Sequence, residues 1–84
     1  MKYQINKDNL DGLILKYPFL SSINVECSEK NTSHVYMDTT IVLETTPLPE
    51  KFYELKLDVY NMVKEKTKKT PIARSGWSLK FSEN

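Results

Sequence analysis

This 84-residue chain contains two segments in which apolar and polar residues alternate, and a polar turn joins them. This pattern restricts the folds that the chain can adopt. In the first, Ile23, Val25 and Cys27 fall on one side. The second, residues 34–45, continues the pattern with Val35, Met37, Thr39, Ile41 and Leu43. A period of two predicts strands with one buried and one solvent-facing side. The polar residues 28–33 between them therefore predict an antiparallel hairpin.

The segments before this hairpin predict a short strand and a helix. Residues 2–6 alternate, and Leu10, Leu13, Ile14 and Tyr17 then follow helical spacing. Asp8 is the expected N-cap residue of this helix, and Pro18 is expected to end it.

The segments after the hairpin predict a long helix and a final strand. Thr46 is the expected cap, Pro47 suits the first helical position, and the helix is expected to reach about Lys69. After a loop, residues 76–81 alternate, which predicts a strand with its apolar side chains inward: Trp77, Leu79 and Phe81.

The resulting order, βαββαβ, predicts an α+β fold in a single domain over residues 1–84. Because every expected strand has one apolar and one largely polar side, we expect an antiparallel sheet with both helices on one face. The assembly that fits this order is the ferredoxin-like split βαβ sandwich.

The second helix carries two apolar stripes where a surface helix needs one. The first stripe comprises Phe52, Leu55, Val59, Met62 and Val63. The second stripe comprises Tyr53, Leu57 and Tyr60, and the polar face comprises Glu54, Asp58, Asn61 and Glu65. Three interpretations of the second stripe stay open. It packs against the first helix, near Leu13 or Tyr17, or its tyrosines form a contact surface for another protein. In the third, Leu57 is buried and the tyrosines lie at the rim.

The chain offers little of the chemistry that enzymes use. Its single cysteine and single histidine exclude an internal disulfide and a Cys/His zinc site within one chain. Cys27 is expected inside and His34 at the solvent-exposed rim, so they should not meet as a nucleophile and base. Glu26, Asp38 and Glu44 are expected on a flat sheet face that suits neither catalysis nor magnesium binding. We expect no enzymatic activity, no small-molecule substrate, no cofactor and no metal.

The expected location is the cytoplasm, because no apolar run resembles a signal peptide or a membrane-spanning segment. The net charge of +1 gives no global attraction toward nucleic acid or membrane. The small size and lysine-rich, arginine-poor composition also fit an accessory or inhibitor protein of a phage or mobile element.

These observations favour a small protein-interaction or regulatory protein that binds a partner protein or self-associates, for example as a homodimer. Two contact surfaces are expected: the stripe of Tyr53, Leu57 and Tyr60, and the open sheet face around Tyr36, Asp38 and Glu44. The alternative is nucleic-acid binding through the basic end of the second helix and the only arginine. That alternative would use Lys64, Lys66, Lys68, Lys69 and Arg74. A small enzyme is the remote alternative.

The C-terminal half also resembles a known family. Residues 37–81, MDTTIVLETTPLPEKFYELKLDVYNMVKEKTKKTPIARSGWSLKF, resemble the strand, long amphipathic helix and alternating final strand of the alkaline-shock protein family. The chain departs from the family pattern where it has KKTP after the helix and WSLKF in the closing strand. The resemblance implies a non-catalytic, self-associating or envelope-linked cytoplasmic protein, and it supplies no catalytic residues.

Overall fold

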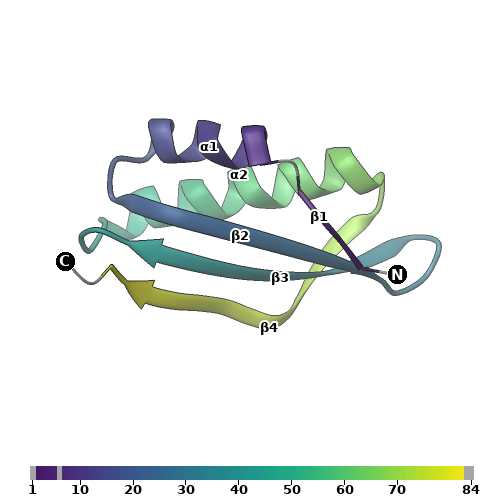
Figure 1. Cartoon of the computed structure of the whole chain (residues 1–84). Coiled ribbons are helices and arrows are strands. Elements are labelled where there is room, and N and C mark those ends of the chain that lie inside the picture. The colour runs from purple at the N-terminus through teal and green to yellow at the C-terminus, as the bar shows by residue number, and fades with distance from the viewer. Residues whose placement is uncertain (1, 6, 83–84) are drawn as a thin grey trace.

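The expected order of strands and helices is confirmed in a computed structural model, which describes residues 2–5 and 7–82 (Figure 1). The elements are β1 (Lys2–Gln4), α1 (Lys7–Lys16), β2 (Leu20–Glu29), β3 (His34–Leu43), α2 (Pro49–Thr67) and β4 (Thr70–Phe81). Over these residues the molecule is α+β, with four strands in one sheet and two helices.

The sheet is mixed, which corrects the expectation of an antiparallel one. Its order is β1-β2-β3-β4, and the predicted β2–β3 hairpin is antiparallel, with Ile23 opposite Ile41. β3 and β4, however, run parallel. Helix α2 has 19 residues and spans about 28 Å, so it returns the chain to the start of β3. A ferredoxin-like sheet would be antiparallel throughout, and that arrangement is not confirmed.

The position of β4 has a simple physical reason. β1 has only three residues and offers a twelve-residue strand little to pair with, whereas β3 has ten. β4 therefore lies along β3 and forms one edge of the sheet, with β1 at the other.

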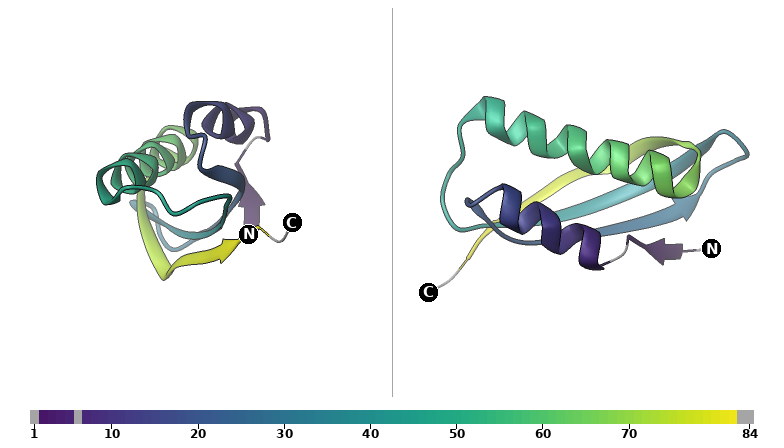
Figure 2. Two further views of the ribbon diagram at one scale, coloured as in Figure 1. Left: turned by 90° about the vertical axis from the view of Figure 1, so that its left-hand side faces the viewer. Right: turned by 90° about the horizontal axis from the view of Figure 1, so that it is seen from above.

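Both helices cover the same face of the sheet, as expected, and the opposite face is open (Figures 1 and 2). The core lies between these layers. Alternate residues of β3 are buried in the predicted phase, and Met37 and Ile41 are almost fully enclosed. Leu55, Val59 and Val63 of α2 are completely buried above them.

One core side chain carries a polar atom without a partner. Thr39 is 3% exposed, and no described group is hydrogen-bonded to its Oγ1. Because a buried unpaired hydroxyl is costly, Thr39→Val should raise the free energy of unfolding by about 1 kcal/mol. Urea denaturation would measure the change. Thr40→Val, on the half-exposed opposite face of the same strand, should give almost none. Equal effects of the two substitutions would contradict this account.

β4 is longer than the sequence predicts, because residues 70–73 already pair with β3 in place of a loop. The amide of Thr70 donates to the carbonyl of Ser33 at 3.0 Å, so the nitrogen of Pro71 faces away from β3. Proline is tolerated at such a position of an edge strand. The register then shifts between Ala73 and Trp77, which divides β4 into two paired halves.

The expectation that the last strand buries its three apolar side chains is wrong for two of them, Leu79 and Phe81. Leu79 and Phe81 pair with Ile41 and Leu43 and thus point to the helix-covered face. They are nevertheless 50% and 59% exposed, because an edge strand has no neighbour on its outer side. Trp77 is half-buried against the core.

The bounds of α2 also differ slightly from expectation. The helix begins at Pro49, and Leu48 occupies the N-cap position without a side-chain hydrogen bond, so Thr46 does not cap it. Proline at the first helical position fixes the start, since its ring presets the backbone angle and its missing amide needs no partner there. At the other end, Lys68 adopts a left-handed conformation with φ of 59°.

Candidate functional site

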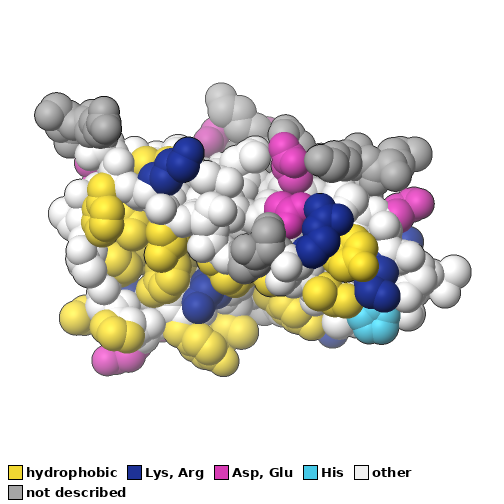
Figure 3. Space-filling model, turned by 90° about the horizontal axis from the view of Figure 1, so that it is seen from below, with side chains coloured by type: hydrophobic (Ala, Val, Ile, Leu, Met, Phe, Trp, Pro, Cys, Tyr) yellow, Lys and Arg dark blue, Asp and Glu magenta, His cyan; other side chains and the backbone are white. Residues whose placement is uncertain are grey.

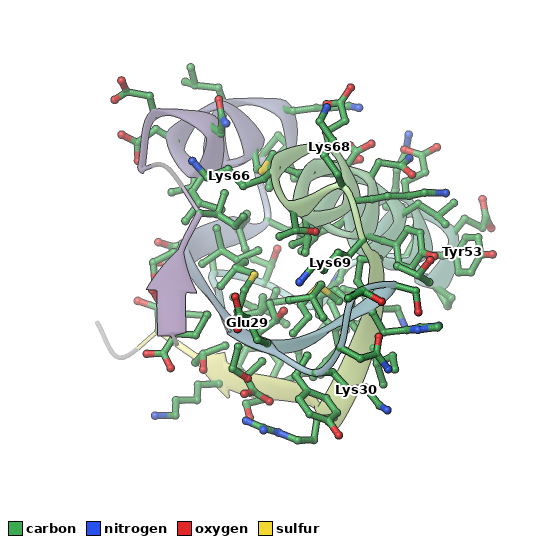
Figure 4. All side chains as sticks on the ribbon, turned by 90° about the vertical axis from the view of Figure 1, so that its right-hand side faces the viewer. Glu29, Lys30, Tyr53, Lys66, Lys68 and Lys69 are labelled. Carbon is green, nitrogen blue, oxygen red and sulfur yellow. The ribbon has the colours of Figure 1, made fainter. Side chains whose placement is uncertain are left out.

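The tyrosine stripe of α2 lies beside β4. Tyr53 and Leu57 are 60% and 43% exposed, and Tyr60 is half-buried. Together they line a groove of about 290 Å³, whose other walls are Met37, Lys56, Pro71, Ala73 and Trp77. Figure 4 shows Tyr53 projecting outward from the helix. The three side chains of the stripe therefore lie together on a partly open surface between α2 and the edge strand β4.

Helix α1 packs against the other flank of α2, so the interpretation that the tyrosine stripe meets α1 is wrong. The contact is made by Asp58, which the helical spacing had placed on the polar face. Its Oδ2 accepts hydrogen bonds from Lys16 Nζ at 2.8 Å and from the Tyr17 hydroxyl at 2.5 Å. A charged residue thus joins the two helices, and the apolar second stripe is left for β4.

These hydrogen bonds shift the ionisation of all three groups. The bond from Lys16, and then the bond from Tyr17, hold the pKa of Asp58 below its ordinary value of 3.8. The bond to Asp58 raises the pKa of Lys16. Burial, followed by the hydrogen bond to Asp58, raises the pKa of Tyr17. The folded state therefore favours the ionised carboxylate.

The lowered pKa of Asp58 predicts how its contribution to stability depends on pH. The contribution is present above the unfolded-state pKa and is lost as pH falls through the lowered folded-state value. Near neutral pH, Asp58→Asn should lower the free energy of unfolding by about 1 kcal/mol. In strong acid the variant and the wild type should converge in urea denaturation.

Glu54→Gln is the matched control, because Glu54 forms only an exposed 3.6 Å pair with Lys51 on the same helix. It should have little effect at either pH. An Asp58→Asn deficit that persists unchanged in strong acid would contradict the assigned role of the carboxylate.

A second apolar groove continues the surface toward the start of α2. It measures about 330 Å³ and lies between the end of β4 and the first turn of the helix. Its walls are Leu43, Thr46, Pro47, Pro49, Phe52, Leu79 and Phe81. Figure 3 shows hydrophobic side chains gathered toward the end where β3 and β4 finish. The two grooves share the α2–β4 flank of the molecule.

We call the combined region the α2–β4 surface. It comprises Leu48, Phe52, Tyr53, Leu57, Tyr60, Trp77, Leu79 and Phe81. Six large hydrophobic side chains are exposed among the described residues, and five of them belong to this surface; Leu15 on α1 is the sixth. Single exposed apolar residues are ordinary, whereas a contiguous group marks an interaction site.

The backbone of β4 adds unpaired hydrogen-bonding groups to the same place. The amide of Ser82 donates to the carbonyl of Leu43 at 2.8 Å. Because successive amides of a strand face opposite edges, those of Phe81 and Leu79 point away from β3. Among the described residues, no strand pairs with this outer edge. Such an edge is a template for another strand.

The open sheet face brings together Tyr36 and Asp38 but not Glu44. Arg74 Nη2 lies 2.7 Å from Asp38 Oδ2, and its guanidinium carbon lies 4.7 Å from the ring centre of Tyr36. Glu44 follows the end of β3, about 20 Å along the chain from Asp38. The second predicted surface is therefore divided.

The basic residues of the nucleic-acid alternative are also divided. Arg74 lies against Asp38 and Tyr36 on the open face, whereas the four lysines belong to the end of α2 and the turn after it. Figure 4 shows Lys66 and Lys68 pointing to different sides, with Lys69 below them toward the sheet. Lys64 and Lys68 line a shallow hollow together with Glu65. These residues form no continuous basic stripe.

Cys27 and His34 lie in different surroundings. Cys27 is 1% exposed, and burial, followed by the charge of Asp38, raises the pKa of its thiol. His34 is half-exposed at the start of β3, where its Nδ1 lies 2.7 Å from Ser33 Oγ. Within the described part of the chain, no group of three or more His, Cys, Asp or Glu side chains could hold a metal ion.

Comparison with known proteins gives no relative. The chain matches no protein-family model, and no curated protein or solved structure is significantly similar to it. The resemblance to the alkaline-shock family therefore stays a prediction. Over residues 2–5 and 7–82, no helix is both long enough and apolar enough to cross a membrane.

Proposed function

We propose that this chain is a small non-catalytic interaction protein that binds another protein chain through the α2–β4 surface. The observation that supports the proposal is the coincidence of two features on one flank. Exposed aromatic and aliphatic side chains adjoin two apolar grooves, and an unpaired strand edge runs beside them. A regulatory or inhibitory role follows if the bound chain is masked by this contact.

The exposed area is large enough to support a specific contact. Tyr53, Leu57, Leu79 and Phe81 are each 43–60% exposed. Together they offer on the order of 400 Å² of apolar surface. This is about half of the roughly 800 Å² that each partner buries in a standard interface. The rest of the interface would come from the surrounding groove walls and from backbone hydrogen bonds of the edge.

The composition of the surface suits protein recognition. Tyrosine, tryptophan and phenylalanine are enriched at interface cores, and Tyr53, Trp77 and Phe81 supply one of each. The only charged side chain among the walls of the two grooves is Lys56. Charge depletion at the centre and aromatic anchors are the features of binding hot spots.

Site-specific photo-crosslinking tests this proposal. A photo-reactive amino acid replaces Tyr53 in one variant of the chain and Leu15 in a second variant. Each variant is irradiated in cells that naturally express the chain, and the lysate is analysed with and without nuclease treatment. Leu15 is the matched control because it is 86% exposed but lies on α1. We expect a discrete protein adduct from position 53, resistant to nuclease, and none from position 15. Equal labelling from both positions, or loss of the adduct with nuclease, would contradict the proposal.

A further inference from the structure

The second half of β4, whose outer edge is unpaired among the described residues, has a sequence that is complementary to itself. Residues 77–81 read Trp-Ser-Leu-Lys-Phe, so an aromatic residue stands at each end and a leucine at the centre. If two copies pair antiparallel about Leu79, Trp77 of one lies opposite Phe81 of the other. Aromatic cross-strand pairs of this kind stabilise antiparallel sheets.

The backbone geometry is compatible with the same centre. The amides of Leu79 and Phe81 face the free edge, and that of Trp77 does too by alternation. In an antiparallel pair centred on Leu79, these three residues all fall at positions that exchange two N–H···O bonds with the residue opposite. Pairing of 77 with 81, 79 with 79 and 81 with 77 therefore forms three double-bonded pairs. A shift of the centre by one residue leaves one of the three apolar residues without an apolar partner.

The charges of the strand are compatible with this pairing. Lys80 and Ser78 point to the open face, since they alternate with the helix-facing residues. In the register centred on Leu79, each Lys80 stands opposite a serine and not opposite the second Lys80. Like charges placed directly opposite would destabilise the pair, and this register avoids them.

The exposed apolar area supplies about half of the roughly 800 Å² that each copy buries in a standard interface. A two-fold axis through Leu79 perpendicular to the sheet leaves both α2 helices on the same face, so the exposed Tyr53 and Leu57 of each copy flank the joined strands. In each copy, exposed apolar side chains with an area on the order of 400 Å² then lie around the axis. Two-fold symmetric dimers are the commonest form of soluble homo-oligomer.

From these observations we infer that the α2–β4 surface is occupied by a second copy of this chain, with β4 pairing antiparallel to β4 about Leu79 to give an eight-stranded sheet. This inference rests on the proposed function and specifies its partner. The strand edge supplies hydrogen bonds, and the apolar side chains on the helix-covered face supply the buried contact.

Charge variants at the axis test the inference, with sedimentation velocity as the measurement. Residue 79 lies opposite itself, so Leu79→Lys and Leu79→Glu each place like charges together. Each should weaken self-association about tenfold or more relative to the wild type, which should approach twice the monomer mass as its concentration rises. An equimolar mixture of the two variants should recover the dimer mass, because opposite charges then meet. Leu15→Lys, an exposed site on α1, should associate like the wild type.

The outcomes separate this inference from the proposed function. Circular dichroism establishes first that each variant is folded, as expected for a half-exposed edge position. A wild type that stays monomeric overturns the self-pairing, and so does a Leu79→Lys protein that dimerises normally. If the wild type stays monomeric while position 53 still crosslinks to a different protein, only the identity of the partner is wrong. If neither self-association nor crosslinking occurs, the proposed function fails as well.

Discussion

Leu55→Ala is expected to destabilise this protein more than any other single truncation on α2. Leu55 is completely buried above the sheet, so its removal loses transfer free energy and leaves a cavity. We expect a loss of about 3 kcal/mol in the free energy of unfolding. A domain of this size has a total of only about 4–12 kcal/mol, so the variant should melt far earlier. Urea denaturation followed by circular dichroism would measure the change.

Leu57→Ala is the matched control, since it removes the same atoms two residues away on the same helix. Leu57 is 43% exposed on the α2–β4 surface. Its truncation should therefore cost about 1 kcal/mol or less. Similar losses for Leu55→Ala and Leu57→Ala would show that the second stripe of α2 belongs to the core, contrary to its placement beside the open groove.

Tyr17→Ala is the second change with a large expected effect. The ring of Tyr17 is only 2% exposed and lies 5.6 Å from that of Phe19, and its hydroxyl bonds to Asp58. Truncation removes the ring and leaves Asp58 with one donor fewer. We expect a loss of about 3–5 kcal/mol, a large part of the total stability of a small domain. Thermal unfolding would show a transition that is shifted strongly downward or absent.

Two further variants help to interpret this effect: one separates the ring of Tyr17 from its hydrogen bond, and the other is a control at an exposed tyrosine. Tyr17→Phe keeps the ring and loses only the hydrogen bond to Asp58, so it should cost about 1 kcal/mol. Tyr53→Ala removes a tyrosine that is 60% exposed, and the protein should stay folded. If Tyr53→Ala unfolds the protein as readily as Tyr17→Ala does, the tyrosines of α2 are structural and the proposed contact surface is wrong.

Local sequence patterns predicted the elements well because each pattern is a property of neighbouring residues. The alternation at 23–27 and 35–43 places the same residues in the core that the structure buries. The pairing of β4 is different, since it depends on segments far apart in the chain. A period of two predicts a strand but carries no information about which strand lies beside it. For this reason the sequence pattern does not predict the parallel β3–β4 pair.

The same limit explains which residues of the candidate site the sequence does not predict. Leu79 and Phe81 point to the expected face, but exposure depends on whether a neighbouring strand or helix covers them. Their position in the last strand was a usable signal, because a terminal strand commonly forms an edge. Helical spacing alone places Tyr53, Leu57 and Tyr60 on one stripe. Helical spacing predicts that Asp58 lies on the polar face, but it cannot show that Lys16 and Tyr17 approach it.

Fluorescence of Trp77 tests most directly the claim that a second copy covers the α2–β4 surface. Trp77 is the only tryptophan of the chain and lines the groove beside Tyr53 and Leu57. We would measure its quenching by acrylamide across a dilution series that spans the dissociation of the dimer. Pairing with Phe81 of the second copy predicts strong protection in concentrated solution and progressive loss of protection on dilution, with Leu79→Lys unprotected throughout. Quenching that is independent of concentration and identical in the wild type and Leu79→Lys would contradict the claim.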